Sequence, residues 1–245
     1  MSWYKKAFGE DYLKIYSHRT RSEAKRHVRF AEKALQLEHG ARLLDLGGGY
    51  GRHAMEMARR GMVVTCYDLS SVLLELGTGH ARRSSLNVQF IRGDMRHLPF
   101  KGVFDAVTSF FTSFGYFEND SSNERVIVEA AKILKPGGLF FLDYLNIRST
   151  LASLKSRDSM RRQGLLVHQE RSFDERSFRL EKKITVHDAD STRSYLESVR
   201  AYGIVEIGHF FSEAGLKCTA VYGDYDGSSF TAGSARLIMI GRKEE

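Results

Sequence analysis

The sequence predicts an α/β protein: a doubly wound parallel sheet with helices on both faces and an inserted antiparallel β cap. From residue 41 to about residue 150, short apolar runs alternate with helical patterns, as in parallel strands joined by crossover helices. A glycine-rich turn follows the first of these runs. After about residue 150 the pattern changes to period-two alternation, which is typical of antiparallel strands with one solvated face.

The strands of the large sheet are predicted from apolar runs bounded by turn residues. They are expected at residues 42–46, 62–67, 88–91, 104–111, 139–143, 216–222 and 235–241. Helical spacing of apolar residues predicts helices over residues 52–61, 72–83, 123–134 and 205–214. Both prolines of the chain, Pro99 and Pro136, fall between these elements, where a residue without a backbone N–H breaks no hydrogen-bond ladder.

Two further segments accompany this sheet. Residues 8–38 are predicted to be helical, and an aromatic-rich N-terminal segment is well placed to cover a ligand on the glycine turn. Period-two alternation predicts three longer strands at residues 165–173, 178–187 and 193–202. The predicted organisation is a helical lid over residues 1–40, an α/β core formed by residues 41–150 and 203–245, and an inserted cap over residues 151–202.

The glycine-rich turn predicts a nucleotide-type cradle. A buried strand runs into Gly47, Gly49 and Gly51 and then into a helix. Backbone N–H groups converge at such a helix N-terminus, and the missing Cβ atoms let a ligand approach closely. The dinucleotide fingerprint is excluded because Arg52 stands where its third glycine belongs, and the sequence has no Gly-Lys-Ser/Thr of a P-loop here.

The motifs around this turn resemble those of the class I S-adenosylmethionine-dependent methyltransferases. The resemblance rests on LLDLGGGYGRHA, CYDLS, IRGDMRHLPF and LKPGG, and it covers residues 41–145. It implies a Rossmann-like methyltransferase fold, with a seven-stranded sheet that is parallel except for one antiparallel strand. It also implies S-adenosylmethionine as cofactor and S-adenosylhomocysteine as product. The N-terminal YLKIYSHRTR, the pattern around Ser113 and the segment HFFSEAGL are similar to the small-molecule branch, such as the N-methyltransferases of deoxyamino sugars.

The resemblance also implies a set of cofactor-binding residues. Asp45 would place negative charge beside the cationic donor, Asp68 would accept hydrogen bonds from the ribose hydroxyls, and Asp94 would accept one from the adenine amino group. Lid residues would cover the donor and hold its carboxylate. For Asp45 and Asp94 the alternative is a local turn cap. The full predicted set is Tyr16, Arg19, Asp45, Gly47, Gly49, Gly51, Asp68, Leu69, Asp94, Met95 and Phe110.

The residues that meet the methyl acceptor are expected on three segments. Tyr12 lies in the lid, Ser113 and Tyr116 follow the fourth core strand, and Arg200 and Tyr202 end the last cap strand. Tyr116 is the predicted catalytic residue, able to orient a nucleophile or accept a hydrogen bond. The alternatives are packing in an aromatic run for Tyr116 and a solvated strand end for Arg200 and Tyr202.

The predicted function is methyl transfer to nitrogen or oxygen of a small-molecule acceptor by in-line displacement. A second hypothesis is an RNA or protein methyltransferase, because the net charge is +7 and basic residues gather in segments 19–33 and 148–162. Solvated helix faces are the favoured interpretation of those segments, so nucleic acid is not the favoured partner. A third hypothesis is a donor-binding protein without catalysis. The resemblance further implies a homodimer contact through the cap.

Composition predicts a cytoplasmic protein. No run of about 18 apolar residues is present, and the N-terminus has no apolar signal core, so neither a membrane span nor a secretion signal is expected. Cys66 and Cys218 lie in apolar runs and are expected to be buried, reduced thiols. The sequence has no Cys/His cluster of the zinc-binding kind, so no metal is expected.

Overall fold

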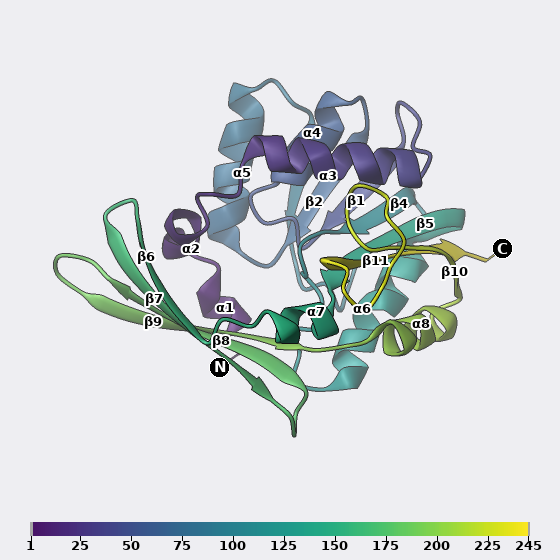
Figure 1. Ribbon diagram of the computed structural model, residues 1–245. Helices are drawn as coiled ribbons and strands as arrows, with labels where there is room; N and C mark the ends of the chain where they lie inside the picture. Colours follow the sequence, from purple (N-terminus) through teal and green to yellow (C-terminus); the bar gives the residue numbers. More distant parts are fainter. Residues whose placement is uncertain (1, 245) are drawn as a thin grey trace.

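The large sheet confirms the predicted doubly wound architecture. The computed structural model describes residues 2–244, and Figure 1 shows the sheet at its centre. Its strands are β1 (Arg42–Leu46), β2 (Val63–Asp68), β3 (Val88–Arg92), β4 (Phe104–Ser109), β5 (Leu134–Leu145), β10 (Leu216–Tyr222) and β11 (Arg236–Lys243). They lie in the order β10-β11-β5-β4-β1-β2-β3. Strand β11 runs antiparallel to both of its neighbours, and the other described pairs are parallel.

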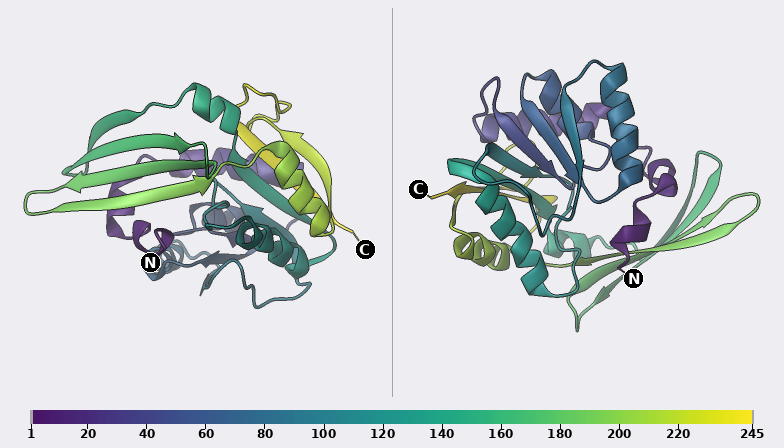
Figure 2. Two further views of the ribbon diagram at one scale, coloured as in Figure 1. Left: turned by 90° about the horizontal axis from the view of Figure 1, so that it is seen from below. Right: turned by 180° about the vertical axis from the view of Figure 1, so that it is seen from behind.

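Helices cover both faces of this sheet, as the two views of Figure 2 show. They are α3 (Arg21–Ala34), α4 (Arg52–Arg59) and α5 (Ser71–Arg83) on one face, and α6 (Asp120–Ile133) and α8 (Ile204–Glu213) on the other. Val28 and Met57 belong to the apolar core of the first face, and Ile127 and Phe211 to that of the second. Because both faces are covered, the strands at the centre of the sheet are mostly buried, whereas the edge strands β3 and β10 are partly exposed.

The strand order places a topological switch point between β1 and β4. From β1 the chain builds outward through β2 and β3 on one side, and it returns to β4 and β5 on the other. The loops that leave the carboxyl ends of β1 and β4 therefore diverge. In open α/β sheets this divergence opens the crevice in which ligands bind.

The cap is a separate antiparallel sheet with one strand more than predicted. Its strands are β6 (Arg157–Arg162), β7 (Leu165–Asp174), β8 (Arg179–His187) and β9 (Thr192–Arg200), and α7 (Ile147–Ala152) leads into it. The sequence did not predict β6, because Met160 is the one apolar residue of this edge strand and no alternation marks it. Tertiary pairing with β7 therefore decides its structure.

The N-terminal segment forms three helices, of which two lie in the predicted helical region of residues 8–38 and one precedes it. Two short helices, α1 (Tyr4–Ala7) and α2 (Glu10–Ile15), precede α3, whose first turn is capped by the Thr20 hydroxyl. Figure 1 shows α1 and α2 against the cap sheet. Asp11 joins them to it: its carboxylate accepts hydrogen bonds from Arg193 Nε at 2.6 Å and from the Tyr195 hydroxyl at 2.7 Å.

The two cysteines differ in environment. Cys66 on β2 is buried, as predicted, whereas Cys218 on β10 is exposed, so the expectation of two buried thiols is wrong for Cys218. Cys218 lies on a strand at the edge of the large sheet, where one strand face meets solvent.

Among residues 2–244, no helix combines the length and apolarity that a bilayer crossing requires.

A buried ion pair connects β5 to β11. The Asp143 side chain is fully buried, and its Oδ1 accepts a hydrogen bond from Arg236 Nε at 2.6 Å. Its Oδ2 accepts a bond from the Phe111 backbone N–H at 2.7 Å and another from the Tyr225 hydroxyl. Tyr225 belongs to the loop between β10 and β11, so one carboxylate organises three segments beside the crevice.

We expect the substitution Arg236→Met to lower the free energy of unfolding by about 3 kcal/mol, because a buried carboxylate would lose its charged partner. Urea unfolding measures this loss. The control is Arg242→Met on the same strand, where the arginine is exposed. Equal stability of the two variants would contradict the assignment.

Candidate functional site

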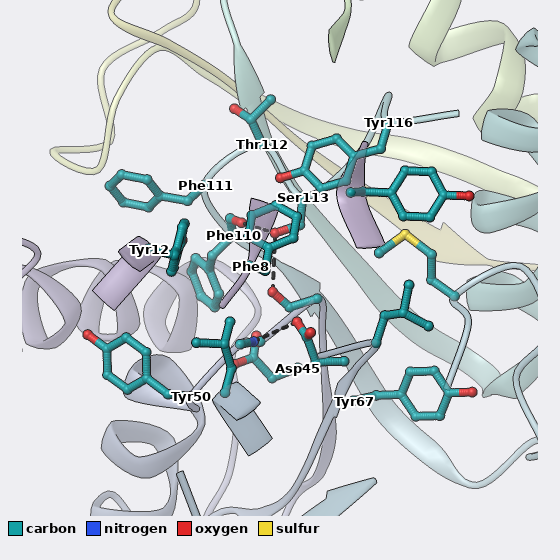
Figure 3. A pocket seen from close by; sticks show the side chains of 18 of the residues that line it. Phe8, Tyr12, Asp45, Tyr50, Tyr67, Phe110, Phe111, Thr112, Ser113 and Tyr116 are labelled. Carbon is teal, nitrogen blue, oxygen red and sulfur yellow. Dashed lines mark hydrogen bonds between the residues drawn. The ribbon is translucent and has the colours of Figure 1, made fainter. Parts of the chain in front are cut away.

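A cavity lies at the carboxyl ends of β1, β2 and β4, beneath α1 and α2 and beside β9. Figure 3 shows part of its lining: Phe8, Tyr12 and Tyr116 stand above Asp45 and Tyr67 in this view. Loops of the core, the N-terminal helices and the cap sheet all contribute side chains. The cavity thus occupies the crevice that the topological switch point opens.

The glycine turn forms the floor of the cavity. Gly47 and Gly49 have φ angles of +71° and +58°, in the left-handed region that favours glycine. The Gly47 N–H donates to the Tyr67 carbonyl at 2.8 Å, and the Gly49 N–H donates to Asp68 Oδ2 at 2.8 Å. A Cβ added to Gly47 would stand 2.7 Å from the Ser113 Cβ. The turn is therefore held close to both β2 and the loop after β4.

Asp45 carries an unpaired oxygen at this floor. The residue is 1 % exposed, and its Oδ1 accepts a hydrogen bond from the Thr108 hydroxyl at 3.3 Å. Its Oδ2 is buried and has no partner among the described residues. Burial raises the pKa of Asp45 to about 7. A carboxylate in this position is suited to a cationic ligand, which would supply the missing partner.

Two further carboxylates follow β2 and β3. Asp68 accepts from Gly49 and, through Oδ1, from the Ser70 N–H at 2.8 Å, and burial raises its pKa. Burial also acts to raise the pKa of Asp94, but the side-chain and backbone hydrogen bonds from Arg96 outweigh it, and the net pKa is lowered. The distance from Arg96 Nη2 to Asp94 Oδ2 is 2.6 Å. Both acids line the cavity at adjacent strand ends.

Aromatic rings form the opposite wall. The ring centroids of Trp3 and Tyr116 are 4.9 Å apart, those of Phe8 and Tyr12 are 5.2 Å apart, and the Phe8 ring stacks on Tyr116 at 5.9 Å. Burial raises the pKa of Tyr116 far above its ordinary value. Its hydroxyl therefore stays a neutral phenol, which can donate or accept a hydrogen bond but does not act as a base at neutral pH.

Arg19 brings a cation to the cavity between these two walls. Its guanidinium carbon lies 4.1 Å from the centroid of the Tyr16 ring, and its Nη1 donates to the Tyr12 hydroxyl at 2.5 Å. Arg19 and Tyr12 line the cavity, whereas Tyr16 stands behind them. Tyr16 therefore positions Arg19 by stacking, rather than covering the cavity directly as the resemblance implied.

One carboxylate enters from the cap sheet. Glu197 and Val199 of β9 line the cavity. The Tyr16 hydroxyl donates to Glu197 Oε1 at 2.7 Å, and Lys182 Nζ on the paired strand β8 lies 3.4 Å from Oε2. The side chains of Lys182 and Glu197 remain 16 % and 21 % exposed. Lys182 Nζ also donates to the Tyr16 hydroxyl, so Glu197 lines the cavity as one member of a cluster with Tyr16 and Lys182.

Most of the predicted residues come together here. Those that line the cavity are Tyr12, Arg19, Asp45, Gly47, Gly49, Asp68, Leu69, Asp94, Met95, Phe110, Ser113 and Tyr116. Gly51 does not line it. This glycine has a φ of +75° at the start of α4, and an added Cβ would stand 2.7 Å from the Phe90 ring. Gly51 therefore lets the chain turn into α4 close to the Phe90 ring without itself lining the cavity.

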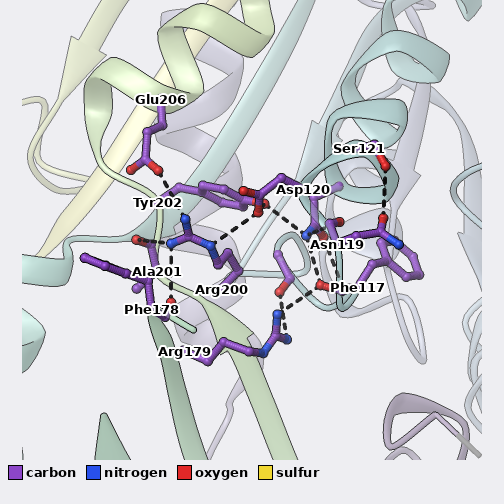
Figure 4. Close-up of polar contacts among 12 residues, drawn as sticks. Phe117, Asn119, Asp120, Ser121, Phe178, Arg179, Arg200, Ala201, Tyr202 and Glu206 are labelled. Atoms are coloured by element: carbon purple, nitrogen blue, oxygen red, sulfur yellow. Dashed lines mark hydrogen bonds and ion pairs between the residues drawn. The ribbon is translucent and has the colours of Figure 1, made fainter. Parts of the chain in front are cut away.

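The structure does not bring Arg200 and Tyr202 to the cavity, which corrects their placement as substrate contacts. Figure 4 shows both in a polar cluster between the cap and α6. The Tyr202 hydroxyl donates to Asp120 Oδ1 at 2.6 Å, and Arg200 Nε lies 3.3 Å from the same atom. Side chains alternate along β9, so the face that meets the cavity carries Glu197 and Val199, and Arg200 lies on the other.

Sequence reasoning missed several lining residues. Trp3 and Phe8 belong to an aromatic-rich segment that was predicted as a lid, although these two were not named as contacts. Arg52 and His53 directly follow the glycine turn, so their proximity to it was a usable signal. Glu197 had no signal of its own, because only the docking of the cap decides which face of β9 meets the lid.

Within residues 2–244, no group of three His, Cys, Asp or Glu side chains is placed to hold a metal ion.

Comparisons with known proteins find similarity to methyltransferases. A family described as "Methyltransferase domain" matches residues 43–138, which span the glycine turn, Asp68 and Asp94. The cypemycin N-terminal methyltransferase of Streptomyces sp is 28 % identical over 211 residues, covering 82 % of this chain and 82 % of that protein.

Solved structures show the same fold over nearly the whole chain. The CcbJ methyltransferase from Streptomyces caelestis has a TM-score of 0.83 at 18 % identity, over 98 % of this chain and 99 % of that one. CalS10, an amino pentose methyltransferase from Micromonospora echinaspora, has a TM-score of 0.70 at 24 % identity, over 96 % of this chain and 97 % of that one. In its motifs, its matched domain and its fold, the chain resembles the class I S-adenosylmethionine-dependent methyltransferases.

Proposed function

We propose that this protein is an S-adenosylmethionine-dependent methyltransferase that acts on nitrogen or oxygen of a small-molecule acceptor. The observation that carries the proposal is the cavity itself. It combines a buried, unpaired carboxylate oxygen on Asp45, a glycine floor and a wall of aromatic rings from the lid. The comparisons support S-adenosylmethionine as the cofactor.

The residues of the core fit this cofactor. Asp45 would face its cationic end beside the glycine floor, and Asp68 would accept hydrogen bonds from the ribose hydroxyls at the end of β2. Asp94 would accept a hydrogen bond from the adenine amino group in place of one of the hydrogen bonds that Arg96 now donates to it. Met95 would present its backbone N–H to the adenine ring. Arg19 would pair with the carboxylate of the amino-acid end.

The bound cofactor supplies an activated methyl group and a sulfonium leaving group. What remains for the protein is to hold the acceptor in line and to exclude water. The rings of Trp3, Phe8 and Tyr116 would exclude water at the lid side of the cavity. The neutral Tyr116 hydroxyl would orient the acceptor's nucleophilic atom by a hydrogen bond, which keeps Tyr116 as the proposed catalytic residue.

A small acceptor is favoured over RNA or protein because lid and cap both wall the cavity. The basic segment 148–162 includes the edge strand β6 of the cap, and no residue of this segment lines the cavity. Among the similar proteins, one is named as an N-terminal methyltransferase and another as a ubiquinone biosynthesis O-methyltransferase, so both nitrogen and oxygen stay in the proposal. The domain organisation, homodimerisation and cytoplasmic location predicted above remain predictions.

The test is a screen for S-adenosylhomocysteine formation with the full chain, S-adenosylmethionine and four acceptor classes: amines, amino sugars, carboxylates and tRNA. Turnover with amines or amino sugars, lost in Tyr116→Phe, supports the proposal. Turnover with tRNA alone would overturn the small-molecule assignment. Binding of the cofactor without turnover of any acceptor would favour a donor-binding protein without catalysis.

We expect cofactor affinity to rise with pH between about 6 and about 8, with a proton released on binding. The pKa of Asp45 is raised to about 7, so the carboxyl is partly protonated in the free protein at neutral pH. A cation beside it favours the carboxylate and lowers that pKa, which links binding to proton loss. Calorimetry in buffers of different ionisation enthalpy measures the released proton. The isosteric variant Asp45→Asn should bind the cofactor without releasing this proton. Proton release that persists in Asp45→Asn would contradict the linkage.

A further inference from the structure

We propose that Glu197 is the specificity-determining residue for the acceptor, and that its carboxylate binds a protonated amino group of the acceptor other than the atom that is methylated, because an ammonium nitrogen has no lone pair to receive a methyl group. This inference rests on the proposed function, because it assigns the acceptor end of the same cavity. It goes beyond that function by naming the charged group that the acceptor must carry and the residue that selects it.

The other carboxylates of the cavity come from the core, at the end proposed for the cofactor. Asp68 accepts two backbone N–H groups, and Asp94 is paired with Arg96. Asp45 lies beneath the glycine floor. Glu197 comes from the cap sheet, on the face of β9 that also carries Val199 into the cavity. It is the acid on the side where lid and cap meet.

The surroundings of Glu197 suit an organic cation. Aromatic rings from Trp3, Phe8, Tyr12 and Tyr116 line the same cavity. The negative faces of such rings attract ammonium groups, and a carboxylate beside them adds a charge-assisted hydrogen bond. The indole N–H of Trp3 is buried without a partner among the described residues. An acceptor that carries an ammonium group and a hydroxyl or carbonyl oxygen could bind the Glu197 carboxylate with the first and accept a hydrogen bond from the Trp3 indole N–H with the second.

Lys182 competes for this carboxylate. Its Nζ lies 3.4 Å from Glu197 Oε2, whereas Oε1 is held by the Tyr16 hydroxyl at 2.7 Å. Lys182 Nζ also donates a hydrogen bond to the Tyr16 hydroxyl, so an incoming ammonium group would replace Lys182 at Oε2 while Tyr16 holds both Lys182 and Oε1 of the carboxylate. It follows that removing Glu197 and removing Lys182 have opposite effects on amine binding, which a merely structural ion pair would not produce.

The test compares two probes of one shape, the cyclohexylammonium ion and cyclohexanol, on the full chain with and without S-adenosylhomocysteine. Trp3 is the only tryptophan of the sequence and lines the cavity, so its fluorescence reports binding at this end. We expect the wild-type protein to bind the ammonium probe at least about tenfold more tightly than the alcohol. Glu197→Gln, whose amide oxygen still accepts from Tyr16, should lose this preference, and Lys182→Met should increase it.

The control is Glu170→Gln, which removes an exposed carboxylate elsewhere on the cap and should keep the wild-type preference. Retained S-adenosylhomocysteine binding by Glu197→Gln shows that this variant is folded. A preference for the ammonium probe that survives in Glu197→Gln, or that falls in Lys182→Met, would overturn the inference. Failure of the wild-type chain to bind S-adenosylhomocysteine would instead count against the proposed function, and the probe comparison without it still tests Glu197.

Discussion

Replacing Asp68 by alanine is expected to weaken S-adenosylmethionine binding by about 100-fold or more. The Asp68 carboxylate accepts from the Gly49 and Ser70 N–H groups, both at 2.8 Å, so it holds the glycine turn and the start of α5 together. Alanine would free both segments and also remove the acceptor proposed for the ribose hydroxyls. Calorimetric titration of the cofactor measures the loss.

The variant Asp68→Asn separates these two contributions. Its single amide oxygen can accept from one of the two N–H groups, so we expect an affinity between those of wild type and Asp68→Ala. Thermal unfolding of each variant shows how much of the change comes from the fold. Unchanged affinity in Asp68→Ala would mean that the ribose assignment is wrong.

The second large effect is expected from Gly47→Ala. Any side chain at φ +71° costs about 1 kcal/mol or more, and here the new Cβ would also stand 2.7 Å from the Ser113 Cβ. The turn would have to move away from the loop after β4, so cofactor affinity should fall more than about tenfold and the free energy of unfolding by about 2 kcal/mol.

Gly49→Ala is the matched control for this experiment. Gly49 lies in the same turn with a φ of +58°, but a Cβ there meets only the Leu73 Cδ1, at 3.5 Å. Both variants carry similar backbone strain, and only Gly47→Ala also loses space. The double variant Gly47→Ala/Ser113→Gly should regain part of the loss. If Gly49→Ala and Gly47→Ala behave alike, close packing against Ser113 does not shape the site.

The core fold could be predicted because its signals are local. Strands β1 and β2 are buried apolar runs that end at Gly47 and at Asp68, and the helices between the strands have regular apolar spacing. The cap edge could not be predicted in the same way. Strand β6 has one apolar residue, Met160, and forms because β7 offers it a partner. The short helix α1 was likewise not predicted, because its four residues are too few to show a helical period.

The candidate site divides along the same line. Asp45, Asp68 and Asp94 follow strands whose carboxyl ends meet at one edge, so sequence order alone brings them together. Glu197 and Arg200 lie on opposite faces of one strand, and only the docking of the cap on the lid decides which face enters the cavity. Sequence reasoning chose Arg200, and the structure presents Glu197.

The central claim is that this cavity binds S-adenosylmethionine, and calorimetric titration of the full chain tests it most directly. One cofactor molecule should bind per chain, S-adenosylhomocysteine should displace it, and Asp68→Ala should abolish the signal at the same concentrations. A titration in which the wild-type chain shows no saturable binding of either molecule would contradict the account.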